Sequence, residues 1–402
     1  MKILLCAYAC EPNRGSEPGV GWQWAINMSD DKQKEVFVLT RSNNKDVINA
    51  YWTDSKCPDN LHFFYYDLPK TLVWAKHHGL PVNLYYAWWM IGAVNYAKRL
   101  HNELHFDMAH HITFGVFRDP CPLYKLNVPY VIGPIGGGEV TPARLMCLYS
   151  AKERFKEWLR EMMNKMALLN PMVNKCFNNA SLILTKTQDT KDLLAKWTDK
   201  TIVNLELGIK SVCNYDIERD NDTFLFVGRF TYWKGVKLVL NAFSRYASNH
   251  PSARLLMIGK GEMECEIKQF AASYNLNIEI IPWIKQEELK HYYSTAGAML
   301  FPSLHDSSGN VVLESLSLGL PVICLDCGGP ASVLGNTLSE LVVDTKNKNV
   351  MSVVDSLREK MEQISTDGEL RKTISKKCIT RAQEMLWHYT VTNSYKLIES
   401  YI

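Results

Sequence analysis

Two carboxylates, Asp306 and Glu314, stand eight positions apart in the last third of the chain. The apolar run Ala298–Phe301 predicts a strand that leads into a turn of small residues, and an apolar helical pattern follows the turn. Gly309 lies where that helix would begin, and the backbone N–H groups of a helix start bind anions. With one carboxylate in the turn and the other on the helix, both can face one ligand. The segment therefore predicts a site for a polyhydroxylated ligand that carries phosphate.

A second cluster lies upstream, where Gly228-Arg229-Phe-Thr-Tyr-Trp-Lys234-Gly235 follows the expected strand Phe224–Val227. Arg229 offers a planar fork of donors and Lys234 a mobile point charge. They lie five positions apart in one turn, so both can reach the same anion. Two simpler roles stay open: Arg229 pairing with a carboxylate, and Lys234 solvated.

Three motifs in this order and spacing occur together in a known enzyme family. The Asp306–Glu314 segment resembles the E-x7-E signature of retaining glycosyltransferases with the GT-B fold, family 4-like (glycosyl transferases group 1), with Asp306 in place of the usual Glu. Residues 228–235 resemble the family's G-R-x4-K-G element, and Met257-Ile-Gly259-Lys-Gly261-Glu lies between the two. The resemblance covers residues 223–334.

The resemblance implies a role for each of these side chains. Arg229 and Lys234 would hold the diphosphate of a nucleotide sugar, Asp306 would contact the sugar hydroxyls, and Glu314 would accept hydrogen bonds from the ribose. An ionised carboxylate suits a vicinal diol because it offers only acceptors. For Trp283, two interpretations stay open: packing in the core, and stacking on the nucleotide base. The other residues expected at the donor are Gly228, Gly309, Asn310, Val311, Lys260 and Ile284.

The first half of the chain offers candidates for the acceptor side of a cleft. In the family, many members carry a His after the fifth strand that contacts the donor sugar, and this chain has none there. His110, His111, Arg118, Glu17 and Glu139 are candidates for that role, with a purely structural His pair as the alternative. The whole predicted cleft set is Gly15, Glu17, Gly19, His110, His111, Arg118, Gly137 and Glu139.

A D-x-D metal motif occurs at Asp220-Asn-Asp222. It precedes an expected strand instead of following one, and it lies in a polar linker. We discount it, and expect neither a metal ion nor another cofactor.

Short apolar runs alternate with helical patterns along the whole chain, which predicts parallel sheets built from βαβ units. Six strands are expected in each half. The polar stretch Lys210–Thr223 predicts the junction. Together with the resemblance, this pattern implies the fold class α/β, GT-B, with two doubly wound Rossmann-like domains facing a central cleft. The resemblance further implies an acceptor domain (1–212), a donor domain (213–386) and a last helix (387–402) that returns to the first domain. The expected strands are Lys2–Tyr8, Val36–Thr40, Phe63–Tyr66, Met108–His111, Tyr130–Gly133, Leu182–Thr185, Phe224–Val227, Arg254–Ile258, Ile278–Ile281, Ala298–Phe301, Val322–Leu325 and Leu341–Val343.

Composition restricts the partners and the compartment. The 402 residues carry a net charge of +3 and are 22% charged, which does not indicate a nucleic-acid partner. The eleven cysteines lack the spacing of a disulfide framework or a zinc site, as expected in a reducing cytosol. The first residues, Met1–Tyr8, have the pattern of a strand and not of a signal peptide. We expect a cytoplasmic protein, with the inner face of a membrane as an alternative location.

The segment Lys152–Leu169 has large apolar residues at helical spacing and basic residues between them. Such a helix suits an anionic membrane surface, where lipid-linked acceptors are found. The alternative is an ordinary amphipathic helix packed on the first domain.

Taken together, the residues and the resemblance predict a retaining, metal-independent glycosyltransferase. Its donor would be a nucleotide diphosphate sugar and its acceptor a glycan or lipid-linked glycan, in cell-surface polysaccharide biosynthesis. Three alternatives stay open: a nucleotide-sugar epimerase of similar fold, a phosphorylase, and a catalytically silent nucleotide-sugar binder. No segment suggests the cofactor lysine that a phosphorylase would need.

Overall fold

The computed structural model describes residues 1–53, 56–213, 218–282 and 284–402. The chain forms two compact units. The first comprises Met1–Gly138, Met162–Glu206 and Trp387–Ile402, and the second comprises Glu139–Glu161 and Leu207–Leu386. The observed division therefore lies before Leu207, a few residues ahead of the predicted junction, and Glu139–Glu161 groups with the second unit instead of the first.

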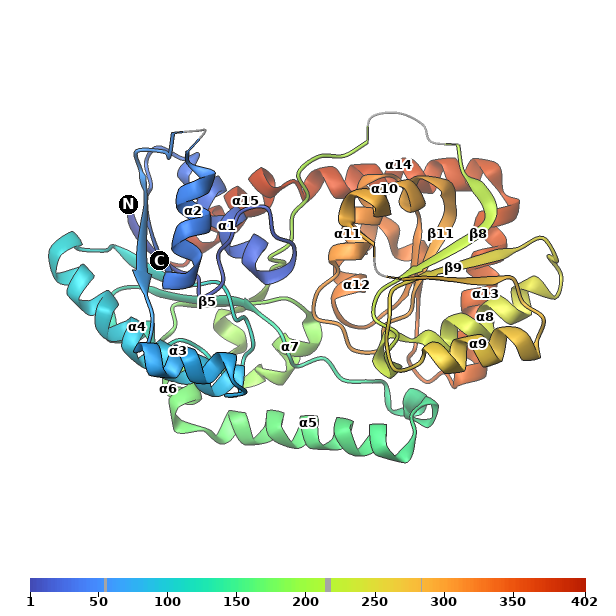
Figure 1. The fold of residues 1–402 in the computed structure, drawn as a ribbon, viewed down its shortest axis with the longest axis horizontal. Helices are drawn as coiled ribbons and strands as arrows, with labels where there is room; N and C mark the ends of the chain where they lie inside the picture. The colour runs from blue at the N-terminus through green and yellow to red at the C-terminus, as the bar shows by residue number, and fades with distance from the viewer. Residues whose placement is uncertain (54–55, 214–217, 283) are drawn as a thin grey trace. The chain divides into compact units, whose positions relative to one another are not determined.

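Each unit is built on one parallel sheet with helices on both faces (Figure 1). The first sheet has the order β3-β2-β1-β4-β5-β6-β7. Its strands are β1 (Lys2–Cys6), β2 (Glu35–Arg41), β3 (Leu61–Tyr66), β4 (Met108–His111), β5 (Tyr130–Ile135), β6 (Leu182–Thr185) and β7 (Thr201–Val203). The twelve predicted strands are all present. The three-residue edge strand β7 was missed, because so short a run shows no periodicity.

The second sheet has the order β10-β9-β8-β11-β12-β13. Its strands are β8 (Asp220–Val227), β9 (Arg254–Ile258), β10 (Ile278–Ile281), β11 (Ala296–Phe301), β12 (Val322–Leu325) and β13 (Val342–Val343). In this unit α8 and α13 pack together on one face, and α11 and α14 on the other. Its helices are α8 (Val236–Ala247), α9 (Glu264–Ser273), α10 (Gln286–Thr295), α11 (Asn310–Ser317), α12 (Gly328–Leu334), α13 (Val350–Thr366) and α14 (Gly368–Glu384).

In the first unit, alternate residues of each strand enter separate cores. Leu4 and Cys6 of β1 pack with α4 and α6, whereas Ile3 and Leu5 pack with α1 and α15. This alternation follows from the two-residue repeat of a strand and explains why both faces must be apolar. The remaining helices are α1 (Ser16–Ser29), α2 (Lys45–Tyr51), α3 (Lys70–His77), α4 (Val82–Leu104), α5 (Ala151–Leu169), α6 (Pro171–Asn179), α7 (Gln188–Leu193) and α15 (Trp387–Glu399).

The last helix belongs to the core of the first unit. Val391, Tyr395 and Ile398 of α15 are buried there, and Asn204 Nδ2 donates to Ser394 Oγ at 2.9 Å. Polar caps define where other helices begin: Asn170 accepts from Met172 N at the start of α6, and Asp367 accepts from Leu370 N at the start of α14.

Candidate functional site

The second sheet has a topological switch point between β8 and β11. From β8 the chain moves outward through β9 and β10, and then returns to β11 on the other side of β8. Ligands of doubly wound sheets bind at such a point, at the carboxyl ends of the strands. The two predicted motifs follow β8 and β11, so both lie in the turns beside it.

The turn after β8 is shaped by Gly235. Its φ of +73° is in the left-handed region, and a Cβ there would lie 2.0 Å from the carbonyl oxygen of Pro302. Only glycine lets this turn lie directly against the end of β11. Gly235 is also the N-cap of α8, just as Gly309 is the N-cap of α11. Neither residue has a side chain that could cap its helix, so two helix starts keep first-turn N–H groups for a ligand.

Lys234 and Asp306 form an ion pair across this switch point. Their side chains are 15% and 20% exposed, and the Lys234 ammonium also lies 5.0 Å from the centre of the Phe301 ring. The simpler role for Lys234, a solvated side chain, is therefore wrong. Arg229 is exposed, and its guanidinium lies 5.5 Å from the centre of the Trp233 ring. Both cations thus lie in the turn that was predicted to bind an anion.

The loop that carries Asp306 is held by backbone contacts. Gly329 N donates to Asp306 O at 2.5 Å, and a Cβ on Gly328 would lie 2.4 Å from the same oxygen. Asn310 and Val311 are the first two residues of α11, as the motif requires. The start of α12 therefore fixes the position of the loop through the backbone of Asp306, while the Asp306 side chain pairs with Lys234.

Glu314, in the second turn of α11, accepts from Gln286 Nε2 at 2.6 Å and from Tyr293 Oη at 3.3 Å. Burial raises its pKa, and the two hydrogen bonds act in the opposite direction. Both donors come from α10. The sequence did not single them out, because nothing in the spacing links α10 to α11.

The other predicted donor residues lie at the same edge of the sheet. Gly228 directly follows β8. Lys260 follows β9, with an exposed side chain and a backbone oxygen that accepts from Phe230 N at 3.0 Å. Ile284 is half-buried just before α10. Trp283 lies outside the described residues.

The first sheet has its own switch point, between β1 and β4. Glu17 Oε1 accepts from Gly115 N at 3.0 Å, which joins the first turn of α1 to the loop after β4. Gly15 precedes α1 in the exposed part of that loop, and a Cβ on Gly19 would lie 2.1 Å from Arg14 O. These loops thus lie at the ligand-binding edge of the first unit.

His110 and His111 are almost fully buried, at 0% and 1% exposed. The carbonyl of Gly133 can only accept, so His110 Nε2 donates to it at 2.7 Å, and Nδ1 accepts from Tyr395 Oη at 2.7 Å. Burial lowers the pKa of His110 to about 4 and that of His111 to about 3. The structure favours a structural pair over the alternative of ligand contacts.

The remaining cleft candidates lie near the end of β5. Arg118 donates to Asn164 Oδ1, and Asn164 Nδ2 donates to Gly137 O at 3.0 Å. Glu139 is 3% exposed and groups with the second unit. Arg118 and Gly137 are therefore joined through a residue of α5, which the sequence did not predict.

A buried carboxylate of α5 is the clearest residue that sequence reasoning missed. Glu157 accepts from Tyr232 Oη at 3.0 Å, from His305 Nε2 at 3.1 Å and from Arg160 Nη2 at 3.0 Å. His305 is the neighbour of Asp306, and its ring stacks on Trp233 with centroids 5.7 Å apart. Glu157 thus ties α5 to both turns of the switch point.

Asp220 and Asp222 lie at the amino end of β8, where they bind neighbouring side chains. Asp220 Oδ2 accepts from Thr223 Oγ1 at 2.6 Å, and Asp222 accepts from Tyr246 Oη at 3.1 Å and Ser252 Oγ at 3.0 Å. The motif is therefore at the opposite end of the strand from the switch point.

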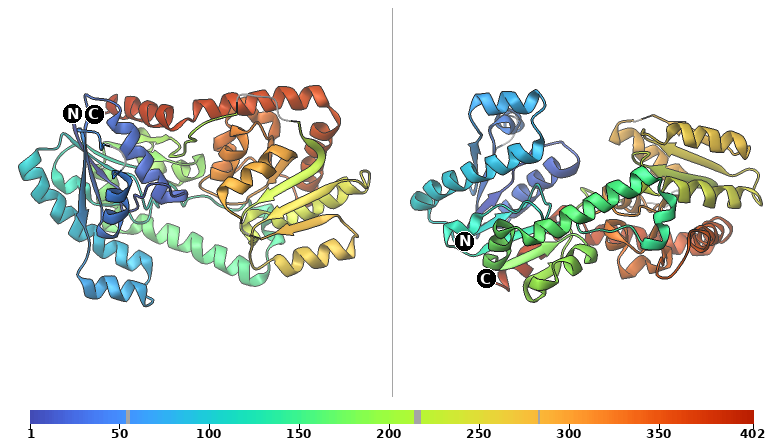
Figure 2. Two further views of the ribbon diagram at one scale, coloured as in Figure 1. Left: turned by 45° about the horizontal axis from the view of Figure 1, so that its top comes forward. Right: turned by 90° about the horizontal axis from the view of Figure 1, so that it is seen from below.

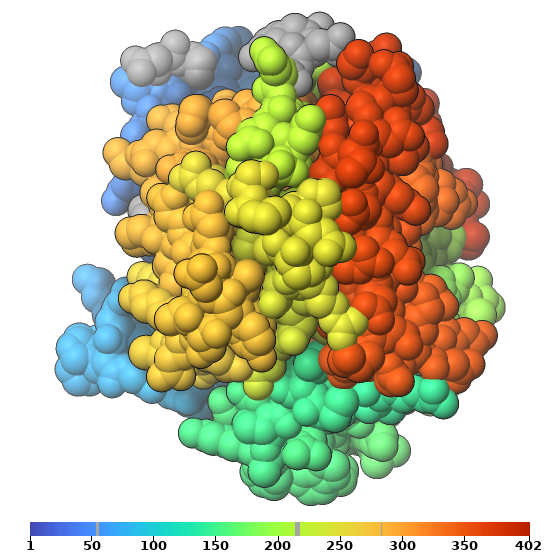
Figure 3. Space-filling model, turned by 90° about the vertical axis from the view of Figure 1, so that its right-hand side faces the viewer, coloured from blue at the N-terminus to red at the C-terminus, as the bar shows by residue number. Residues whose placement is uncertain are grey.

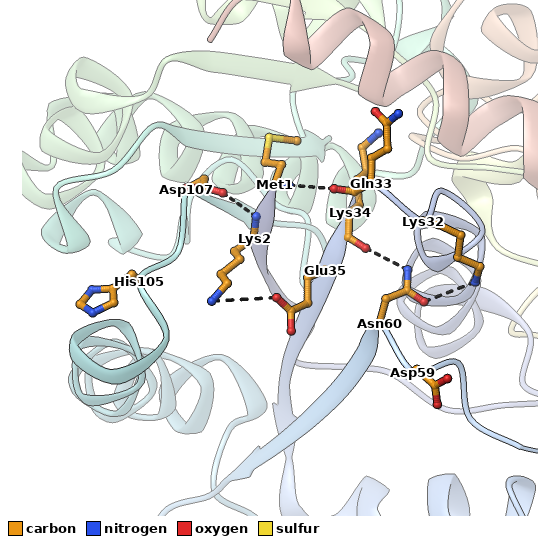
Figure 4. Close-up of a pocket in the computed structure, with 10 residues that line it drawn as sticks. All are labelled: Met1, Lys2, Lys32, Gln33, Lys34, Glu35, Asp59, Asn60, His105 and Asp107. Carbon is orange, nitrogen blue, oxygen red and sulfur yellow. Dashed lines mark hydrogen bonds and ion pairs between the residues drawn. The ribbon is translucent and has the colours of Figure 1, made fainter.

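A hollow of about 690 Å³ lies at the amino edge of the first sheet (Figure 4). Its polar groups satisfy one another: Met1 N donates to Gln33 O at 2.7 Å, Lys2 N to Asp107 Oδ2 at 2.6 Å, and Asn60 Nδ2 to Lys34 O at 2.8 Å. The hollow lies at the amino ends of the strands, whereas the switch points lie at their carboxyl ends. We assign it no function.

The sequence of the second unit matches a family model. Residues 214–381 match the model described as Glycosyl transferases group 1, and this range covers most of the Leu207–Leu386 part of the unit. This part of the chain is similar to glycosyl transferases group 1. The matched range contains the motif residues Arg229, Lys234, Asp306 and Glu314 described above.

Similar proteins agree with this assignment. The uncharacterized glycosyltransferase MJ1607 of Methanocaldococcus jannaschii is 24% identical over 46% of this chain and 44% of its own length. The capsular polysaccharide biosynthesis glycosyltransferase CapM of Staphylococcus aureus is 26% identical over 38% and 40%. The chain spans about half the length of the curated relatives it matches.

The solved structure of Anabaena HepE in complex with UDP and glucose resembles the whole chain, with a TM-score of 0.59 at 12% identity and coverage of 100% of both chains. Likeness at this identity shows the fold. With its two doubly wound units, the chain has the GT-B fold.

Proposed function

We propose that the chain is a retaining, metal-independent glycosyltransferase that moves a sugar from a nucleotide diphosphate sugar to a glycan or lipid-linked glycan in cell-surface polysaccharide biosynthesis. One observation carries this proposal. The β8–β11 switch point gathers Arg229, Lys234 and two helix starts without side-chain caps beside Asp306. This is a site for a diphosphate next to a group that accepts from hydroxyls.

The chemistry explains why such a site suits glycosyl transfer. Breaking the bond between a sugar and a diphosphate leaves negative charge on the departing group. Fixed N–H groups and two cations stabilise that charge as it develops, without a bound metal. A diphosphate that accepts from Lys234 competes with Asp306 for the ammonium group. The Asp306 carboxylate is then released toward the sugar hydroxyls.

The acceptor is assigned to the first unit. The loops after β1, β4 and β5 carry Gly15, Glu17, Gly19, Arg118 and Gly137 at the carboxyl edge of its sheet. The names of CapM and of HepE with UDP and glucose support a polysaccharide product and a nucleotide-sugar donor.

Calorimetry with UDP, GDP and ADP tests the donor site. We expect Arg229→Ala and Lys234→Ala each to weaken binding of the preferred nucleotide by about 1.5–3 kcal/mol, the range of charge-assisted hydrogen bonds. Lys268→Ala is the matched control, because Lys268 pairs with Glu264 on the exposed side of α9. Unchanged affinity in both site variants would remove the site assignment.

Turnover assays separate the alternatives. A transferase releases nucleoside diphosphate only when an acceptor is added. Sugar-nucleotide conversion without acceptor would indicate an epimerase, and binding without turnover across a broad acceptor panel would indicate a silent binder.

A further inference from the structure

Helix α5 presents its apolar side to solvent. Phe155 is 61% exposed, Trp158 53% and Met166 64%, and the stripe continues through Leu159, Met162, Met163 and Leu169. These positions recur every three or four residues, so they form one face of the helix. The alternative in which this face packs on the first domain is therefore wrong.

The polar side of α5 is the side that packs. Glu157 and Asn164 are each 3% exposed. Glu157 is held by Tyr232, His305 and Arg160, and Asn164 by Arg118 and Gly137. These bonds fix the rotation of the helix about its axis. Because the polar side is bound to the protein, the opposite, apolar side faces the solvent. Figure 2 shows α5 as one uninterrupted helix.

Basic residues border the apolar face on both sides. Helical geometry places Lys152 and Lys156 along one border and Arg154 and Lys165 along the other. All four are exposed, and within the described residues none has an ion pair. Of the three carboxylates on this helix, two do not neutralise these basic residues. Glu153 accepts from Ser150 N at 2.7 Å, and Glu157 is buried. The face therefore combines apolar area with net positive charge.

The exposed surface extends beyond the helix. Met172, on α6 directly after α5, is 39% exposed. Figure 3 shows the green part of the chain, around residue 150, at the surface along the lower edge of the view. Among the described residues no helix is both long and apolar enough to cross a membrane.

We propose that this face of α5 lies on a bilayer that contains anionic lipids. Phe and Trp side chains enter the boundary between headgroups and acyl chains, and lysine and arginine side chains bury their stems while their charges reach the headgroups. A second copy of this chain fits less well, because a two-fold contact through this face would bring its own basic borders together. The proposal does not rest on the glycosyltransferase assignment, since it concerns binding to lipid.

Co-sedimentation of the full chain with vesicles tests the proposal. The parent protein should bind phosphatidylcholine vesicles that contain phosphatidylglycerol, should bind pure phosphatidylcholine vesicles much more weakly, and should be released by high salt. Changing Lys152, Arg154, Lys156 and Lys165 to Gln should weaken binding by about fivefold per residue. The variant Phe155→Ser/Trp158→Ser/Met166→Ser should lose binding while its melting temperature stays unchanged, because these side chains are exposed.

Trp74→Ser is the matched control, since Trp74 is an equally exposed aromatic side chain, at 62%, on a different helix, α3. It should bind vesicles as the parent does. Three results would overturn the proposal: no binding by the parent, loss of binding only in the Trp74 control, or a lower melting temperature with unchanged binding in the triple serine variant. A parent that sediments as a dimer, and as a monomer once the three serines are introduced, would assign the face to a second copy instead.

Discussion

At the scale of single residues, the switch point divides two carboxylates between different partners. Asp306 is paired with Lys234 in the turn, whereas Glu314 is held by Gln286 and Tyr293 one helix further on. In the proposed function, the carboxylate paired with Lys234 contacts the transferred sugar. The carboxylate on α11 contacts another part of the same ligand. The two should therefore respond differently to substitution.

Asp306→Asn keeps the size of the side chain and removes its charge. We expect turnover to fall by about a hundredfold or more, as when a group that acts in the transition state is lost, while affinity for the bare nucleotide changes little. Glu314→Gln should weaken nucleotide binding itself. Kinetics together with calorimetry provide the comparison, and equal effects of Asp306→Asn on both quantities would mean that the two roles are assigned wrongly.

Glu157 makes the free energy of unfolding depend on pH in the acid range. Burial alone would raise its pKa, but the hydrogen bond and charge of His305 and the charge of Arg160 outweigh burial and lower the pKa to about 2 from an ordinary value of 4.5. A lowered carboxyl pKa stabilises the fold above the unfolded value, and this stabilisation is lost as the pH falls from 4.5 toward 2.

Glu157→Gln should therefore lower the free energy of unfolding by about 1–3 kcal/mol at neutral pH, because its partners lose a buried charge. It should also flatten the loss of stability in the acid range. Urea unfolding between neutral and acid pH measures both. Glu161→Gln, half-exposed on the same helix, is the control and should behave as the parent does.

At the scale of elements, glycines decide how closely the turns of the second sheet approach one another. Gly235 lies against Pro302, and a Cβ on Gly259 would lie 2.0 Å from Gly228 O. These contacts join the ends of β8, β9 and β11, the three strands that carry the motifs. The site therefore depends on backbone packing as much as on its charged side chains.

Gly235→Ala should lower the free energy of unfolding by about 1–3 kcal/mol, because alanine meets both a positive φ and the Pro302 oxygen. It should also weaken nucleotide binding by moving Lys234. Gly368→Ala is the control, since a Cβ there would meet only Arg371 at 3.7 Å at the start of α14. Thermal unfolding with and without nucleotide reports both effects, and a Gly235→Ala protein as stable as the Gly368 control would contradict the account.

At the scale of the whole molecule, both units follow one plan. Each has a parallel sheet, a switch point next to its first strand and motif-bearing loops at the carboxyl edge. The D-x-D motif lies at the amino end of β8, where Thr223, Tyr246 and Ser252 bind its carboxylates. In the proposed function, the positive charge available to a diphosphate comes from Arg229 and Lys234.

We accordingly expect turnover to persist in excess EDTA. The assay compares initial rates of nucleoside diphosphate release before and after chelation. Loss of activity that magnesium or manganese restores would require a metal site and would bring Asp220 and Asp222 back into consideration.

The strands and the motifs of the second unit could be predicted from the amino-acid sequence alone. Apolar runs of four to eight residues between turn residues mark strands locally, and the order of the Arg229–Lys234 and Asp306–Glu314 motifs is a property of the chain. Each motif follows a parallel strand, and parallel strands end at the same edge of the sheet. This edge is where ligands of such sheets bind.

Which side chains are buried and which are paired could be learned from the three-dimensional structure alone. The burial of His110 and His111, the pairing of Lys234 with Asp306 and the ties from Glu157 to His305 all join residues from separate elements. The outward apolar face of α5 was also undecided, because its periodicity fits a packed helix equally well. Polar anchors at Glu157 and Asn164 set its rotation, and no local pattern encodes the partners that hold them.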